Sequence, residues 1–140
     1  MTPANAPIQD LPGVSASQAN GLAQLGLTTI EQLYRYGQSP VHRQTLAQTL
    51  AVPERYIKKW VILAELARLP SVGCTYSGLL LHAGIISVSQ LADSTAPMLY
   101  TRIQRLHVKT MQRTNLCPSA DQVSTWIQQA KQMQAQMRRT

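Results

Sequence analysis

Leu11 to Leu33 reads LPGVSASQANGLAQLGLTTIEQL, and Leu69 to Leu91 reads LPSVGCTYSGLLLHAGIISVSQL. The second stretch repeats the first at a constant offset, because 69 − 11 and 91 − 33 both give 58. Seven positions are identical without a gap: Leu11, Pro12, Val14, Leu22, Gly26, Gln32 and Leu33 recur as Leu69, Pro70, Val72, Leu80, Gly84, Gln90 and Leu91. So many identities in one register indicate an internal duplication.

Each stretch predicts a helix, a tight turn and a second helix. Leu-Pro cannot continue a helix, and Gly13 or Gly73 supplies the positive φ that the turn needs. The later caps are predicted at matching positions: Gly26 and Gly84 as left-handed C-caps, Thr29 and Ser87 as N-caps of the next helix. We name the two predicted turns turn 1 (residues 11–15) and turn 2 (residues 69–73).

The remainder of the chain predicts further helices. These cover residues 41–50, a segment that begins near Pro53, a segment that begins near Pro97, and a last helix after Ser119. The apolar stripe Ile57, Trp60, Val61 and Ala64 recurs as Val123, Trp126, Ile127 and Ala130, at an offset of 66. The second copy has therefore gained eight residues, which we place around the helix that begins near Pro97.

The predicted fold is all-α, with two tandem pseudo-symmetric helix-hairpin-helix repeats, each followed by two further helices. Residues 1–9 are predicted as a flexible leader, 10–68 as repeat 1 and 69–137 as repeat 2. Both repeats are expected to pack as one domain through the helices that carry Trp60 and Trp126, which we interpret as core residues rather than base-stacking platforms.

Composition favours an anionic partner, because the chain has 13 Lys and Arg but 6 Asp and Glu, which gives a formal net charge of +7. The N-terminus has no signal-peptide pattern, and no stretch reaches the roughly 20 apolar residues of a membrane span. We therefore expect a cytoplasmic protein. Cys74 and Cys117 are too few for a disulfide framework, and we expect ordinary thiols.

The chain resembles an uncharacterised family of small bacterial proteins, common in cyanobacteria, that is described as a domain of unknown function with tandem helix-hairpin-helix motifs. The resemblance is carried by segments spread over nearly the whole chain: Leu11-Pro12-Gly13-Val14, Leu25-Gly26-Leu27, Ala64-Glu65-Leu66, Val72-Gly73, Ala83-Gly84-Ile85, Leu91-Ala92 and Trp126-Ile127. It implies that paired hairpins reach both strands of a duplex minor groove. It also implies phosphate binding by the hairpin N–H groups, with a monovalent cation as the one cofactor that the hairpins could hold.

The first candidate site is the backbone of the two turns: Gly13, Val14, Ser15, Ser71, Val72 and Gly73. N–H groups at a helix N-terminus bind phosphate readily. However, neither turn has the full Gly-hydrophobic-Gly pattern of DNA-binding hairpins, and neither is followed directly by Lys or Arg. Two interpretations stay open, a phosphate clamp and a turn that only packs helices.

The second candidate site is a set of cations. Arg102, Arg105, Lys109 and Arg113 fall on one helical face, and the corresponding helix of the first copy carries Arg55, Lys58 and Lys59. These side chains could neutralise phosphates. The alternatives are a solvated helix face and a surface for an acidic protein partner.

We expect no enzyme and no metal site. The six acidic residues are scattered singly, and the three histidines share no metal-ligand spacing with each other or with the cysteines. The sequence thus favours a non-catalytic module that contacts DNA or structured RNA through phosphates, without sequence preference. The alternative is a protein–protein adaptor or assembly factor that uses the same fold for docking.

Overall fold

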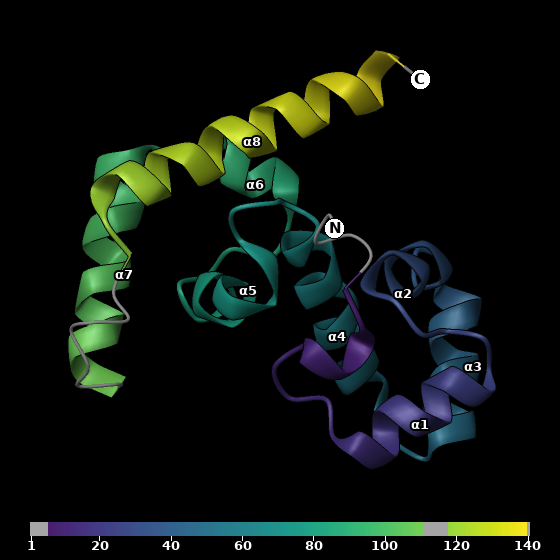
Figure 1. Ribbon diagram of the computed structural model, residues 1–140. Coiled ribbons are helices and arrows are strands. Elements are labelled where there is room, and N and C mark those ends of the chain that lie inside the picture. The colour runs from purple at the N-terminus through teal and green to yellow at the C-terminus, as the bar shows by residue number, and fades with distance from the viewer. Residues whose placement is uncertain (1–5, 111–117, 140) are drawn as a thin grey trace. The chain divides into compact units, whose positions relative to one another are not determined.

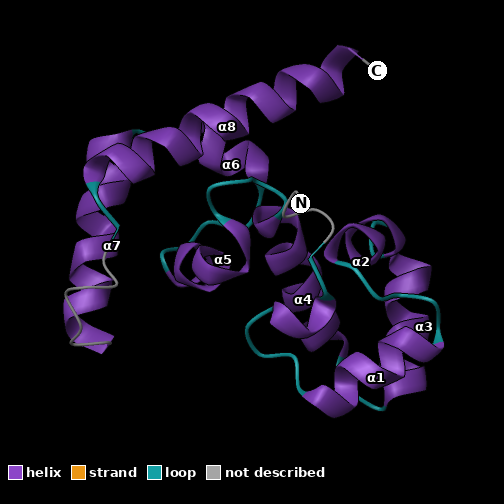
Figure 2. Ribbon diagram, in the orientation of Figure 1, coloured by secondary structure: helices purple, strands orange, loops and turns teal. Residues whose placement is uncertain are grey.

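The computed structural model describes residues 6–110 and 118–139. Figure 2 shows that the elements in this part of the chain are helical, as predicted, with one isolated bridge between Pro7 and Thr29. The elements, labelled in Figure 1, are a 3-10 helix η2 (Ile8–Asp10) and the α-helices α1 (Ala16–Gln24), α2 (Ile30–Tyr36), α3 (Pro40–Leu50), α4 (Glu54–Ala67), α5 (Gly73–His82), α6 (Val88–Asp93), α7 (Ala96–Thr110) and α8 (Ala120–Arg139).

The chain divides into two units, which we name unit 1 (residues 1–78) and unit 2 (residues 79–140). The division falls inside α5, whereas the sequence duplication places the repeat boundary between residues 68 and 69. Turn 1 and turn 2 therefore both belong to unit 1.

In unit 1 the core is built on α4, against which α2 and α3 pack. The predicted stripe of α4 is buried, with Ile57 and Ala64 at 0% exposure and Trp60 at 2%. The partner helices contribute Ile30 and Leu33 from α2 and Leu46 from α3, all at 0%. Burial of this apolar stripe supplies most of the stabilisation of a helix that carries polar residues on its outer face.

The first described residues are tied to unit 1. The Ile8 N–H donates to the Thr28 carbonyl at 3.0 Å, the Ile30 N–H donates to the Ala6 carbonyl at 3.0 Å, and the Ile8 side chain is buried. Residues 6–9 therefore differ from the flexible leader that their composition predicted. The reason is that the apolar side chain of Ile8 is buried in the core, while Ile8 and Ala6 each make one backbone hydrogen bond to the segment around α2.

In unit 2, α8 packs against α6 and α7. Leu91 from α6 and Ile103 from α7 are buried at 0% exposure. The predicted stripe of α8 is also buried, as in α4, and consists of Val123, Trp126, Ile127 and Ala130. No helix in the described part of the chain is both long enough and apolar enough to cross a membrane.

The predicted caps form in both halves of the sequence. Gly26 has φ +84° and Gly84 has φ +94°. Equivalent hydrogen bonds of 3.0 Å close the two helix ends: Leu27 N–H to Leu22 O and Gly26 N–H to Ala23 O, and Ile85 N–H to Leu80 O and Gly84 N–H to Leu81 O. Thr29 and Ser87 accept from the Gln32 and Gln90 N–H groups as N-caps. This local agreement is consistent with the duplication, while the symmetric arrangement of two repeats stays a prediction.

Replacing Ala51 with glycine should stabilise the protein by about 1 kcal/mol. Ala51 ends α3 with φ +55° and ψ +45°, a left-handed conformation that costs a residue with a β-carbon roughly 1–2 kcal/mol. Glycine removes this strain, although the greater freedom of its unfolded chain offsets part of the gain. Urea unfolding followed by circular dichroism measures the change. Ala23→Gly, in α1, is the control, because it should lower stability instead; if both variants lose stability, the left-handed strain at Ala51 is not significant.

Candidate nucleic-acid interface

Turn 1 leads directly into α1, whose N-terminus is capped by Ser15. Gly13 has φ +84°, and Ser15 and Gln18 form a capping box, in which the Ser15 N–H donates to Gln18 Oε1 at 2.9 Å and the Gln18 N–H donates to Ser15 Oγ at 3.1 Å. The first four N–H groups of an α-helix lack intrahelical acceptors. The capping box uses two of them, the Ser15 and Gln18 N–H groups, so helix geometry leaves the Ala16 and Ser17 N–H groups as donors at the start of α1.

A cation lies next to turn 1. A β-carbon built on Gly13 would be 3.8 Å from Nζ of Lys59, which is exposed on α4. The residues that follow turn 1 in sequence carry no Lys or Arg, so the cation comes instead from a position 46 residues later (59 − 13). The sequence predicts Lys59 and turn 1 as parts of two separate candidate sites, because only the packing of α4 brings them together.

The first two turns of α4 carry further exposed residues of the same kind. Arg55 and Lys58 are exposed, as predicted for a basic face, and Tyr56 between them is 43% exposed. The Arg55 guanidinium carbon lies 5.3 Å from the centre of the Tyr56 ring, within cation–π range. Tyr56 was not among the predicted site residues; its signal in the sequence is an aromatic residue inside the basic run Arg55 to Lys59.

Turn 2 is arranged differently from turn 1. The Val72 and Gly73 N–H groups both donate to the Leu69 carbonyl at 3.0 Å, whereas in turn 1 the Val14 N–H reaches the Leu11 carbonyl at 3.4 Å. Gly73 has φ +54°, and no described atom lies within 4 Å of a β-carbon built on it. The Val72 and Gly73 N–H groups, which were predicted as phosphate donors, are therefore hydrogen-bonded to the backbone of turn 2 itself. Among the described residues, no cation lies beside Gly73 as Lys59 lies beside Gly13.

Turn 1 also lies beside α5 within unit 1. A β-carbon built on Gly78 would be 3.2 Å from Cγ of Pro12, so glycine allows this close approach.

Burial, and secondarily the negative charge of Asp10, raises the pKa of the Cys74 thiol. The thiol is therefore held protonated at neutral pH, which fits the ordinary thiol that the sequence predicted rather than a nucleophile.

The predicted cations of α7 are placed in unit 2 and are only partly described. Nη1 of Arg102 donates to the Ala83 carbonyl at 3.1 Å, so this guanidinium caps the C-terminal end of α5. Arg102 and Arg105 line a surface hollow of about 450 Å³ together with Pro97, Met98 and Thr101. The Lys109 side chain and all of Arg113 lie outside the described residues.

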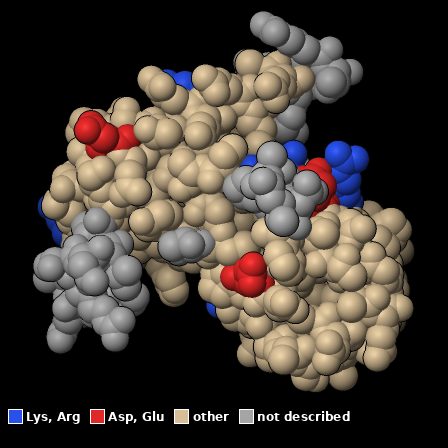
Figure 3. Space-filling model, in the orientation of Figure 1, with Lys and Arg blue, Asp and Glu red and all other residues tan. Residues whose placement is uncertain are grey.

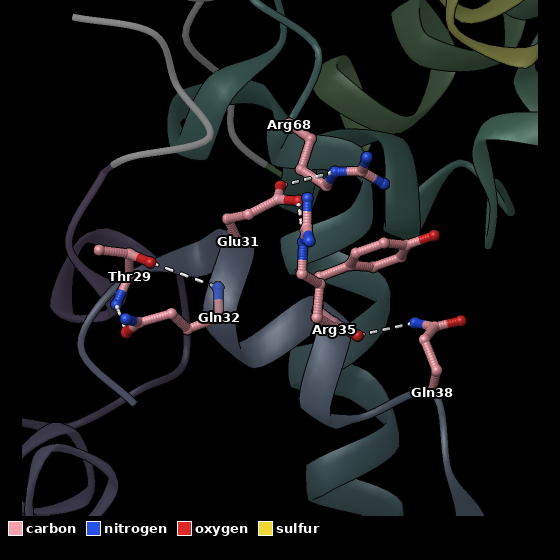
Figure 4. Close-up of polar contacts among 7 residues, drawn as sticks. Thr29, Glu31, Gln32, Arg35, Gln38 and Arg68 are labelled. Atoms are coloured by element: carbon pink, nitrogen blue, oxygen red, sulfur yellow. Dashed lines mark hydrogen bonds and ion pairs between the residues drawn. The ribbon is translucent and has the colours of Figure 1, made fainter. Parts of the chain in front are cut away.

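Other charged residues of unit 1 serve packing (Figure 4). Glu31 accepts from Nε of Arg35 at 2.7 Å and from Nε of Arg68 at 3.0 Å, and the Arg68 guanidinium lies 4.0 Å from the centre of the Tyr34 ring. The hydrogen bond to Glu31, and then its charge, raise the pKa of Arg35. The cluster connects α2 to the end of α4.

On the face drawn in Figure 3, the charge is local rather than continuous. Figure 3 draws one face of the molecule, on which Lys and Arg form isolated groups among mostly uncharged atoms. The described residues contain no group of three or more His, Cys, Asp or Glu side chains that could hold a metal ion. Among the described residues, Lys59 and the start of α1 form the best-defined set of donors for an anion.

No curated protein and no solved structure matches the chain. A family described as a domain of unknown function, DUF4332, matches residues 12–133, which run from turn 1 into α8 and cover most of each unit. The predicted resemblance to a domain-of-unknown-function family is thus confirmed. Because the match extends over most of the chain, the protein belongs to the DUF4332 family.

Proposed function

We propose that this protein is a non-catalytic binding module that contacts DNA or structured RNA through its phosphates, without sequence preference. The observation that carries the proposal is the approach of the Lys59 ammonium group to Gly13 in turn 1, three residues before the first N–H groups of α1. Both are typical phosphate ligands, one by charge and one by directed hydrogen bonds and the helix dipole.

The composition of this surface favours backbone contacts over base recognition. Arg55, Lys58 and Lys59 are exposed on α4, and phosphate contacts by such side chains fix position but carry no sequence information. Together with the overall charge of +7, they favour binding that depends on salt.

Fluorescence anisotropy of the full-length protein with labelled nucleic acids tests the proposal. If three cations contact phosphates, raising salt from about 50 to about 200 mM should weaken binding by about fortyfold. At a given salt concentration, Lys59→Gln should bind more weakly than the wild type, and its slope of log affinity against log salt should be smaller in magnitude by about one. The control is Lys131→Gln, an exposed position on α8 with the same change of net charge, which should leave the slope unchanged. Equal effects of the two variants, or no binding at low salt, would reject the proposal.

A second candidate function, a protein–protein adaptor, is favoured by the hollow on α7. Met98 in its lining is 65% exposed, and Arg102 and Arg105 lie beside it. This combination suits a partner segment with an apolar anchor and acidic neighbours. A photo-reactive residue at position 98 should then give a protein adduct that survives high salt and disappears with Arg105→Glu. An equal adduct from position 128, exposed elsewhere in unit 2, would argue against a specific surface.

A further inference from the structure

We infer that the nucleic acid bound by the α4 surface is single-stranded, with one base stacked on Tyr56. The inference rests on the proposed function, since it names the kind of nucleic acid that the same surface would take. Its basis is the ring of Tyr56, 43% exposed on the first turn of α4 with Arg55, Lys58 and Lys59 around it in sequence.

The positions of these side chains along α4 suit a single strand. Residues three and four apart lie on the same side of a helix, so Lys59 follows both Arg55 and Tyr56 one turn later. The Arg55 guanidinium already lies 5.3 Å from the ring centre, and Lys59 reaches turn 1. An aromatic face flanked by cations that follow the backbone is the usual arrangement of a single-strand binding surface, because any base can stack on the ring.

A duplex does not expose a base face on which the Tyr56 ring could stack. Inside a double helix the faces of the bases are covered by their neighbours, and side chains meet only base edges and phosphates. An exposed ring on a convex helix surface contributes little to such a contact. On a single strand, the bases can turn outward and stack on aromatic side chains.

The differences between the two copies also argue against a symmetric grip on a duplex. At the offset of 66 residues, Arg55, Tyr56, Lys58 and Lys59 correspond to Asp121, Gln122, Ser124 and Thr125. The second copy therefore replaces three cations and a ring with one acid and three uncharged polar residues. In addition, turn 2 uses the Val72 and Gly73 N–H groups internally. The set of three cations and one aromatic ring is therefore present in the first copy alone at these matched positions, which suits contact with a single strand rather than a symmetric contact with both strands of a duplex.

The test compares labelled oligonucleotides of about 16 nucleotides, the upper end of the usual site size for such surfaces. Single-stranded DNA, single-stranded RNA and the matching duplex are titrated with the full-length protein at low salt. We expect the better single strand to bind about tenfold more tightly than the duplex, and the two single-strand titrations identify which sugar is preferred. Tyr56→Ala and Tyr56→Leu should each lose about tenfold for the single strand, the range expected for one stacked base. Tyr56→Phe, which keeps the ring, should bind like the wild type.

The outcomes separate this inference from the proposed function. If the duplex binds as well as either single strand and Tyr56→Ala has no effect, while Lys59→Gln still weakens binding, the inference is wrong and the phosphate-binding proposal stands. If no nucleic acid binds, both fail. Tyr56→Leu keeps an apolar side chain at position 56, so we expect its thermal unfolding temperature to equal that of the wild type. An equal unfolding temperature shows that its loss of binding does not reflect a loss of fold.

Discussion

Replacing Trp60 with alanine is expected to lower the free energy of unfolding of unit 1 by about 3–5 kcal/mol, the usual cost of deleting a buried aromatic side chain. Trp60 is 2% exposed and lies in the α4 stripe between Ile57 and Val61, both of which are buried. The loss combines the apolar surface that is no longer removed from water with the cavity left behind. An effect of this size is a large fraction of the stability of a small domain.

The measurement can separate the two units. The protein has two tryptophans, so in the Trp60→Ala variant the fluorescence of Trp126 reports on unit 2 alone, while circular dichroism reports on all helices. We expect a first loss of helix at low urea and a later change in Trp126 fluorescence. Trp60→Phe, which keeps a ring, should cost less than alanine.

The same variant also tests the interpretation of the tryptophans as core residues. If Trp60 stacked on bases instead, Trp60→Ala would weaken nucleic-acid binding and leave the unfolding free energy nearly unchanged. A loss of stability below about 1 kcal/mol, typical of exposed positions, would contradict the buried core described here. Tyr56, four residues earlier and 43% exposed, should behave in the opposite way.

Local elements could be predicted from the sequence because their causes are local. The left-handed φ at Gly26 and Gly84, and the Thr29 and Ser87 caps, follow from residue types within one turn of the helix end. The buried stripe of α4 follows from apolar spacing alone. The all-helical class follows from the same signals, repeated along the chain.

Contacts between distant segments could not be predicted. Nothing near turn 1 in sequence indicates that Lys59 reaches Gly13, and nothing near α5 indicates that Arg102 caps it at Ala83. Both contacts depend on how helices pack, and a long flexible cation can reach many positions. The basic face predicted for α7 therefore stays a prediction, to which the structure adds a hydrogen bond from Arg102 to the Ala83 carbonyl.

Replacing Gly37 with alanine is expected to destabilise unit 1 by about 2–3 kcal/mol, within the range for overpacking a core. Gly37 follows α2 with φ −78°, which every residue adopts, so the cost is steric and not conformational. A β-carbon built there would be 2.3 Å from Cγ2 of Val61 and 3.1 Å from the Leu33 carbonyl oxygen. Val61 is buried on α4, and a β-branched side chain in a helix has one strongly preferred rotamer. The side chain therefore cannot turn away, and α2 must move from α4.

A double-mutant cycle decides whether this clash is the cause. Val61→Ala alone should destabilise by removing buried methyl groups, but combined with Gly37→Ala it makes room for the new methyl. The double variant should therefore be more stable than the sum of the single losses by at least about 1 kcal/mol. Gly21→Ala is the matched control, because its β-carbon would be 2.5 Å from Cδ2 of Leu50, the end of a half-buried flexible side chain that can shift. We expect Gly21→Ala to cost less than Gly37→Ala; additive losses in the cycle, or equal losses for the two glycines, would mean that α2 and α4 do not pack as closely as described.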